Sequence, residues 1–359
     1  MVQTRAVAET WRWQWRSARP RESLIVTLAL MLVAAGCSWA VPGWCVGPSI
    51  GGCATGPTSP APRPERPTPA DRLLAPGDRS GPAVVGVATP GLPANLSGVD
   101  GFEALTGADV GIVSWYTAFG QRFGAERAAQ VSDRGEIPMI SWEPWDPGRG
   151  VDQPRYSLAR IIAGDHDGYL RGWAAQLAAF DRPVLLRFAH EMNGDWYPWA
   201  EGVNGNRPGQ YVAAWRHVHE IFQAEGADRV RWTWSPNTVH GSHQALSGLY
   251  PGDELVDWVA IDGYNGGTAL NMGGWLSPET LFVDSIANVR ALTGRPIMIG
   301  ETASTEHGGD KAQWISRLFA LLSDHPEIRA FVWFDIDKET DWRVGSSAAS
   351  LAAFRHEIR

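Results

Sequence analysis

The stretch "PVLLRFAHE", Pro183 to Glu191, begins as an apolar run and ends in two polar side chains. Seven other short runs have the same apolar character, which is typical of strands buried on both faces. They lie at residues 83–88, 109–116, 137–143, 230–235, 256–264, 296–301 and 328–335. Segments with helical spacing separate the runs, as at 168–180, 209–226 and 311–324. Eight strands alternating with helices predict an α/β fold, a (β/α)8 TIM barrel, with a doubly wound open sheet as the alternative.

The N-terminal part, residues 1–55, is predicted to be a signal peptide or a membrane anchor. Several arginines precede the apolar run Leu24 to Ala35. The sequence "VAAGC", Val33 to Cys37, is similar to a lipoprotein cleavage box, whereas the uncut run 24–41 is long enough to span a bilayer. Both alternatives predict a secreted or cell-envelope-anchored protein, which contacts a membrane only through this segment.

Residues 56–82 are rich in proline, which removes backbone donors and favours extended chain, so we expect a linker there. Residues 83–359 would then form the (β/α)8 barrel domain. The net charge is -8 and the basic residues form no block beyond the N-terminus, which argues against nucleic acid as a partner. The three cysteines all precede residue 54, so the barrel has no thiolate nucleophile.

Aromatic and acidic side chains gather where the predicted strands end. In a (β/α)8 barrel these ends share one rim, and active sites lie there. The residues are Trp115, Tyr116, Trp142, Glu143, His190, Glu191, Trp234, Asp262, Tyr264, Glu301, Trp333 and Asp335. Aromatic rings can lie on the apolar faces of sugars while their polar groups meet hydroxyls. The pattern predicts a cleft for a neutral polysaccharide.

Glu191 and Glu301 end the fourth and seventh runs, so they are expected to face each other across the barrel mouth. Glycoside hydrolysis uses two carboxyl groups, about 5 to 5.5 Å apart when one is a nucleophile. One group must stay protonated and the other ionised, so their surroundings must differ. Glu143, Asp262 and Asp335 compete for the same roles, and spacing does not rank them. A separation above about 10 Å would contradict the hypothesis.

A zinc site is not predicted. The sequence "HEMNG" begins like a zinc-protease helix, but the second histidine of that motif is replaced by Gly194. His240 and His243 lie close together without a third ligand nearby. No metal and no other cofactor is expected.

The longer stretch "RFAHEMNGDWYPW", Arg187 to Trp199, resembles the signature of glycoside hydrolase family 26. Shorter stretches support the resemblance: "SWEPW" (141–145), "DGYN" (262–265), "IGETAS" (299–304) and "VWFD" (332–335). The family belongs to a clan of retaining (β/α)8 hydrolases. By this resemblance Glu191 is the general acid/base and Glu301 the nucleophile.

The resemblance also implies four residues that bind substrate. His190 would hydrogen-bond near the nucleophile or the sugar, and Trp196 would stack on the leaving side. Tyr264 would orient the nucleophile by a hydrogen bond. Trp333 would form a platform under the sugar that is attacked.

For the substrate, the resemblance puts 1,4-β-mannan first, with 1,3-1,4-β-glucan (lichenan) or 1,3-β-xylan as alternatives. Many mannanases of the family have an arginine beside the tryptophan of the eighth strand, whereas Phe334 follows Trp333 here. That departure weakens the preference for mannan. A glycan-binding protein without catalysis is the alternative from another class, and the presence of both glutamates argues against it.

Overall fold

The computed structural model describes residues 67–75, 81–240 and 244–359. Its eight strands form one closed parallel barrel in the order of the chain. They are β1 (Val84–Ala88), β2 (Val110–Ala118), β3 (Ile137–Glu143), β4 (Val184–Phe188), β5 (Val230–Trp234), β6 (Trp258–Asn265), β7 (Ile297–Ser304) and β8 (Ile328–Phe334). β8 pairs with β1 and closes the ring. The predicted (β/α)8 barrel is confirmed, and the open-sheet alternative is wrong.

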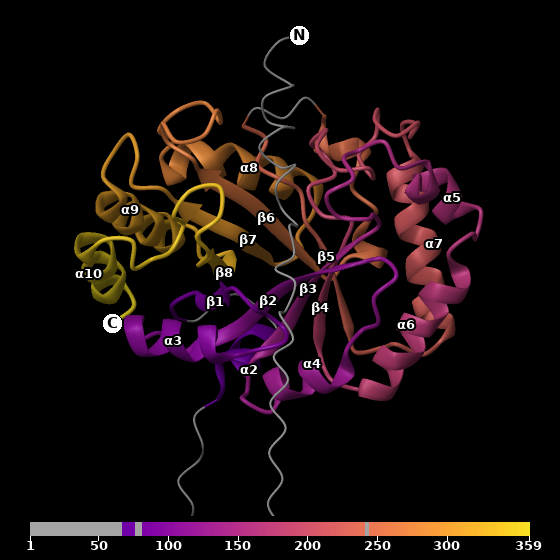
Figure 1. Cartoon of the computed structure of the whole chain (residues 1–359), viewed down its shortest axis with the longest axis horizontal. Coiled ribbons are helices and arrows are strands. Elements are labelled where there is room, and N and C mark those ends of the chain that lie inside the picture. Colours follow the sequence, from indigo (N-terminus) through magenta and orange to yellow (C-terminus); the bar gives the residue numbers. More distant parts are fainter. Residues whose placement is uncertain (1–66, 76–80, 241–243) are drawn as a thin grey trace, which may run out of the picture. The chain divides into compact units, whose positions relative to one another are not determined.

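Helices surround the barrel (Figure 1). After β1 they are α3 (Ser97–Thr106), α4 (Ala125–Ser132), α5 (Leu158–Ile162), α6 (Asp167–Phe180), α7 (Gln210–Ala224), α8 (Pro278–Leu292), α9 (Lys311–Asp324) and α10 (Ala348–Glu357). The three helical segments predicted from spacing correspond to α6, α7 and α9. Gly226 follows α7 with a φ of 75°, the left-handed conformation expected just beyond a helix.

Strand side chains alternate between the barrel interior and the helical layer. The interior is filled by aliphatic side chains that include Ile112, Met139, Leu185, Met298 and Val332. The opposite faces of the strands pack against the helices in a second, larger cluster. The two clusters therefore separate most inward-facing strand side chains from those that pack against the helices.

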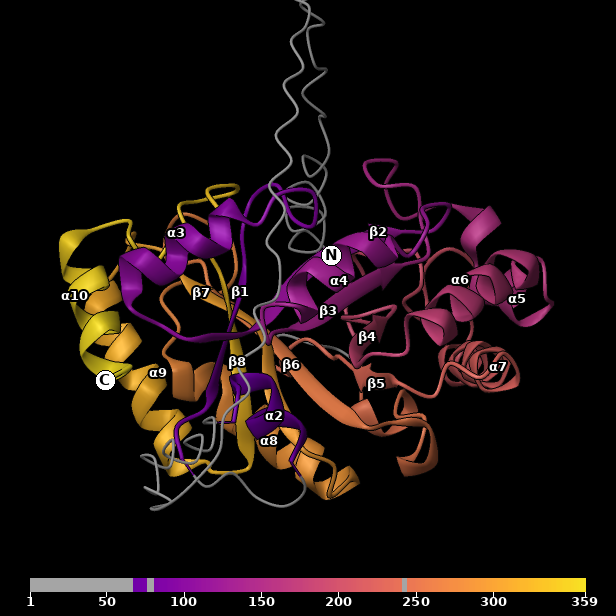
Figure 2. The same ribbon diagram turned by 90° about the horizontal axis from the view of Figure 1, so that it is seen from below.

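Part of the segment predicted as a linker is folded onto the barrel. Helix α2 (Pro69–Leu74) lies within residues 56–82 and contacts β1 and β2. It is the short indigo helix against the barrel in Figure 2. Thr68 and Asp71 form a reciprocal capping box at its start, and Leu73 is buried in the interior cluster. The boundary at residue 83 is therefore wrong for this helix, because its cap and one buried leucine outweigh the surrounding prolines.

The predictions for residues 1–66 concern the signal or anchor and the first part of the linker. These residues lie outside the described ranges. None of the helices within the described ranges is long and apolar enough to cross a membrane.

Candidate active site

Glu191 lies at the barrel mouth, but not on the strand. β4 ends at Phe188, and Ala189 and Glu191 both have left-handed backbone conformations, with φ of 51° and 52°. The predicted run to residue 191 was three residues too long. A φ above zero is costly for a non-glycine residue and is found where the surroundings enforce it. Here the Glu191 N–H donates to the carbonyl of Ser235 at 2.6 Å, which ties the turn to the chain after β5.

Both carboxylate oxygens of Glu191 accept a hydrogen bond. The Trp196 indole donates to Oε2 at 2.8 Å and the Asn237 amide donates to Oε1 at 2.6 Å. Burial and the negative charge of Glu301 nevertheless raise the pKa of Glu191 to about 7. The group can therefore hold a proton near neutral pH, as a general acid must.

Glu301 lies on β7 and has two strong donors. Arg187 Nη1 donates to Oε1 at 2.6 Å, and the Tyr264 hydroxyl donates to Oε2 at 2.7 Å. Burial alone would raise its pKa, but the charge of Arg187 and the two hydrogen bonds outweigh burial and lower the pKa below its usual value. Glu301 is therefore ionised in the same pH range in which Glu191 is protonated.

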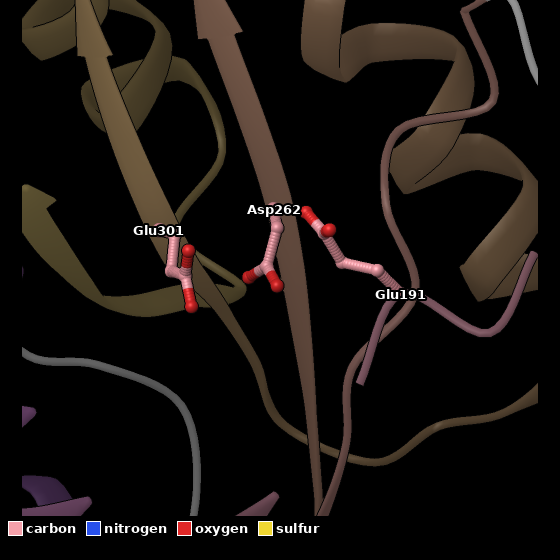
Figure 3. Close-up of side chains that lie close together, drawn as sticks. All are labelled: Glu191, Asp262 and Glu301. Carbon is pink, nitrogen blue, oxygen red and sulfur yellow. The ribbon is translucent and has the colours of Figure 1, made fainter. Parts of the chain in front are cut away.

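A third carboxyl group, that of Asp262 on β6, completes the cluster. Oxygen atoms of Glu191, Asp262 and Glu301 all lie within 4.8 Å of one another. Figure 3 shows Asp262 between the two glutamates, each on a different element. The structure thus brings Glu191 and Glu301 together, well inside the 10 Å limit set from the sequence.

Arg187, on β4, lies beneath this cluster and is fully buried. It contacts Asp262 Oδ2 through Nη2 as well as Glu301. Hydroxyl oxygens of Ser141 and Ser235 accept from Arg187 at 2.9 and 2.7 Å. Burial raises the pKa of Asp262 well above its usual value, and the charge of Arg187 acts in the opposite direction.

The three carboxyl groups are close enough to bind a metal ion. The guanidinium of Arg187 already contacts Asp262 and Glu301, however, and its charge repels a second cation. The arrangement suits an acid and a nucleophile better than a metal centre.

His190 lies beside the cluster among aromatic rings. Its ring centroid is 5.0 Å from that of Tyr197 and 5.9 Å from that of Tyr116. Burial and the charge of Arg187 lower the pKa of His190 to about 3, so the imidazole is neutral at neutral pH. Its Nδ1 is buried without a hydrogen-bond partner in the structure. The histidine lies beside the carboxyl cluster and forms no hydrogen bond to Glu301, and its contact with a sugar stays a prediction.

Trp333 is not at the mouth, and the expectation of a platform there is wrong. The side chain is fully buried and packs on the helical side, with ring centroids 6.2 Å from Trp314 of α9 and 5.7 Å from Phe354 of α10. The reason is the alternation along β8, which points Val332 into the barrel and Trp333 outward. Its indole donates to the carbonyl of Trp342 at 3.1 Å.

Two aromatic rings from β8 and the loop after it approach the site in place of Trp333. Phe334 lies edge-on to Tyr264 at 5.7 Å, and Trp342 lies 5.2 Å from the same ring. Because the Tyr264 hydroxyl donates a hydrogen bond to Glu301, these rings lie near that carboxylate. The position one residue further along β8 therefore faces Tyr264 and the carboxyl cluster.

The remaining rival carboxylates stand apart from the pair. Glu143 accepts a hydrogen bond from the Trp145 indole at 3.2 Å, and burial raises its pKa to about 8. Asp335 accepts from the backbone N–H of Val344 at 2.6 Å and fixes the loop after β8. Neither belongs to the cluster of three carboxyl groups.

Arg187 and Asn237, which contact the two glutamates, were not predicted from the sequence. Arg187 had a visible signal, since it is a charged residue in the middle of an otherwise apolar strand. Asn237 had none, because it lies in an irregular segment after β5 and reaches Glu191 only in the folded chain.

Comparisons with known proteins agree with this geometry. Residues 151–295 match the family model described as Glycosyl hydrolase family 26. Endoglucanase H of Acetivibrio thermocellus is 38% identical over 269 residues, which are 73% of this chain and 29% of that protein. Mannan endo-1,4-beta-mannosidase A and B of Caldalkalibacillus mannanilyticus is 40% identical over 87 residues, 23% of this chain and 16% of that protein. The chain therefore spans less than a third of the length of either relative.

Among solved structures, the catalytic domain of the family 26 endo-beta-1,4-mannanase of Bacillus sp. JAMB-750 has a TM-score of 0.61. The match covers 80% of this chain and 88% of that one at 20% identity, a level at which the likeness concerns the fold. The sequence matches, the barrel and the paired glutamates at its mouth agree, and the chain belongs to glycosyl hydrolase family 26.

Proposed function

We propose that the protein is a retaining, endo-acting glycoside hydrolase that cleaves a β-linked polysaccharide, with 1,4-β-mannan as its first candidate substrate. One observation carries the proposal. Two carboxyl groups within 4.8 Å of each other have pKa values shifted in opposite directions, that of Glu191 to about 7 and that of Glu301 below its usual value. Such a pair supplies a proton donor and a nucleophile at the same pH.

In the first step, a Glu301 oxygen attacks the anomeric carbon while Glu191 gives its proton to the departing oxygen. The bond to the leaving group breaks, and a covalent glycosyl-enzyme forms. Its formation removes the negative charge of Glu301, which is one cause of the high pKa of Glu191. Glu191 then acts as a base toward water, and hydrolysis of the ester releases a sugar with retained configuration.

The neighbouring side chains have distinct tasks in this scheme. Tyr264 fixes one oxygen of Glu301 and leaves the carboxylate aligned for attack. Trp196 holds Glu191 by its indole N–H and presents its ring on the leaving-group side. The neutral imidazole of His190, with a free nitrogen, can hydrogen-bond a sugar hydroxyl.

A β-glucan is the second candidate substrate, because a specific observation favours it. The relative that matches most of this chain, at 38% identity, is named an endoglucanase, whereas the 40% match to a mannosidase covers only 23% of the chain. Phe334 occupies the position next to Trp333 where an arginine was expected for mannan.

Reducing ends released from 1,4-β-mannan, 1,3-1,4-β-glucan and 1,3-β-xylan separate these candidates in one assay. We expect hydrolysis of mannan, or of mixed-linkage glucan if the second candidate holds. Proton NMR of the first product formed should show the β-anomer. An α-anomer would exclude retention, and binding without any released ends would favour a glycan-binding protein.

Variants of the two glutamates assign the roles. Glu301→Ala should abolish cleavage of both polymer and 2,4-dinitrophenyl glycoside, because no nucleophile is left. Glu191→Ala should keep the first step with the dinitrophenyl glycoside, since that leaving group needs no proton. Equal loss in both variants with the activated substrate would contradict the assignment.

The localisation remains part of the proposal. The arginines and the apolar run at the N-terminus support export, with the chain either released or held at the cell envelope. Fractionation of the native host and mass spectrometry of the mature N-terminus would distinguish cleavage after Gly36, cleavage elsewhere and a retained anchor.

A further inference from the structure

We propose that Asp262 is the counter-ion that keeps Arg187 paired while Glu301 is consumed as the glycosyl ester. This inference rests on the proposed retaining mechanism and adds a task for a carboxyl group that the mechanism above does not use. Asp262 does not touch the reacting atoms in this scheme; it acts through Arg187.

The starting point is the charge of the buried cluster. Arg187 is fully buried and contacts two carboxylates, Glu301 and Asp262. Its other two side-chain partners, Ser141 and Ser235, are neutral hydroxyls. A guanidinium keeps its charge at all relevant pH values, so it needs an anion in this dry environment.

Esterification of Glu301 removes one of those two anions. Before the first step, Arg187 faces Glu301 and Asp262 together. In the glycosyl-enzyme, Glu301 is neutral, and Asp262 is the remaining carboxyl group in contact with Arg187. A buried charge whose only partner is removed is strongly destabilised. Without Asp262, Arg187 would be unpaired in the glycosyl-enzyme and increasingly so in the transition state that leads to it. The resting enzyme would be spared, because Glu301 still pairs with Arg187 there.

The ionisation of Asp262 follows the same cycle. Burial and the charges of Glu301 and Glu191 raise its pKa, while Arg187 lowers it. When Glu301 is esterified, its negative charge no longer raises the pKa of Asp262, while the positive charge of Arg187 still lowers it. The pKa of Asp262 therefore falls, and the ionised form is favoured. Any proton that it holds in the resting cluster passes to solvent, and a proton returns when hydrolysis frees Glu301.

The backbone makes room for this group. Gly300, directly before the nucleophile, faces Asp262, and a Cβ at that position would lie 2.5 Å from Asp262 Oδ1. That oxygen is buried without a hydrogen-bond partner in the structure. A buried carboxyl group with a purely structural role would normally have hydrogen-bond partners for both oxygens. Figure 3 shows the carboxyl group placed between the two glutamates instead.

The charged and titratable side chains that face Asp262 come from several elements. They are Arg187 of β4, Glu191 and Tyr197 of the loop after β4, Tyr264 of β6 and Glu301 of β7. Burial and nearby negative charge raise the pKa of both tyrosines well above their usual value, so they stay neutral.

The direct test uses the unmodified enzyme. Carbon-13 NMR of the labelled aspartate and glutamate carboxyl groups follows Asp262 in the free enzyme and after trapping with 2,4-dinitrophenyl 2-deoxy-2-fluoro-β-mannobioside, or the cellobioside if that labels faster. We expect the midpoint of Asp262 to fall by at least about one pH unit on trapping. An unchanged or higher midpoint would overturn the inference. Labelling of a residue other than Glu301 would instead overturn the proposed function.

A variant supplies the kinetic test. Asp262→Asn should slow the glycosylation step at least about a hundredfold with the dinitrophenyl glycoside, while deglycosylation is unchanged or faster. Ser235→Ala is the control, since it removes a hydrogen bond of 2.7 Å to Arg187 without changing charge, and its two steps should keep their ratio. Equal slowing of both steps in Asp262→Asn would indicate simple misplacement and sink the proposal. If that variant does not fold, the NMR titration still decides.

Discussion

The two ends of the barrel each hold an arginine from a strand, and the partners of the two arginines differ. At the end where the strands begin, Arg329 of β8 donates to the backbone carbonyls of Arg72 and Ala75 at 3.0 and 2.6 Å. Its guanidinium also lies 5.3 Å from the centre of the Trp258 ring. These contacts hold helix α2 and its flank against the barrel.

At the other end, Arg187 is surrounded by carboxylates and hydroxyls. Its two acidic partners are themselves beside a third acid, Glu191. The same type of side chain thus binds backbone carbonyls at one end and neutralises part of an acidic cluster at the other. The chemistry of the partners therefore distinguishes the two ends: the structural end, where Arg329 holds α2, and the chemical end, where Arg187 contacts Asp262 and Glu301.

Arg187→Met should have the largest effect, because it leaves two buried carboxylates without their cation. We expect a loss of about 3 to 5 kcal/mol in the free energy of unfolding and no measurable turnover. Urea unfolding followed by tryptophan fluorescence, together with dinitrophenyl glycoside hydrolysis, measures both. Arg329→Met is the matched variant, and its folded fraction should turn over at the wild-type rate. Full activity in Arg187→Met would contradict the claim that Arg187, unlike Arg329, is needed for the reaction.

Leu73→Ala tests the structural end alone. Leu73 of α2 is fully buried in the interior cluster, so its truncation should lower the free energy of unfolding by about 3 kcal/mol through lost burial and a cavity. We expect kcat and KM of the folded enzyme to stay unchanged. Urea unfolding and steady-state kinetics at low temperature check both parts. A change in kcat would mean that the two ends are coupled.

Tyr264→Phe tests the chemical end alone. Without the hydroxyl, one oxygen of Glu301 loses its donor, and we expect kcat to fall about tenfold to a hundredfold. The lost hydrogen bond also stabilised the carboxylate, so the pKa of Glu301 should rise and the acidic limb of the pH profile should move upward. Tyr211→Phe is the control, because its buried hydroxyl has no partner. An unmoved acidic limb would contradict the role given to Tyr264.

The sequence was most informative where periodicity decides the structure. Apolar runs located all eight strands, because strands buried on both faces need continuous apolar side chains. The structure brings Glu191, Glu301 and Tyr264 together, as their positions near the ends of the runs implied. The capping box of α2 was readable in "TPAD", Thr68 to Asp71, and was hidden by the proline-rich composition around it.

The sequence was least informative where a shift of one residue decides which face of a strand a side chain points to. Trp333 and Phe334 are adjacent, and only the strand's position in the barrel shows that the first faces the helices and the second faces Tyr264. A pairing irregularity between Ile261 and Asp262 shifts the register of β6 and β7 beside Glu301. Such shifts follow from closing the ring and have no signature in hydrophobicity.

Trp196→Phe should give the smallest effect, and it tests how a neighbouring side chain sets the pKa of Glu191. The indole N–H at 2.8 Å favours the charged form of Glu191, whose pKa is about 7 because burial and Glu301 outweigh that bond. Loss of the donor removes a stabilisation of the carboxylate, so the pKa of Glu191 should rise further. The alkaline limb of kcat/KM, which reports the protonated acid, should then move upward by less than about one pH unit.

Trp314→Phe is the control for this variant, since its indole bonds the backbone carbonyl of Leu276 at 2.8 Å in the helical layer. Its pH profile should match that of the wild type. A downward shift in Trp196→Phe would mean that the ring's exclusion of water matters more to Glu191 than its hydrogen bond. The sign of one limb thus separates two ways in which a tryptophan can set the proton affinity of a buried acid.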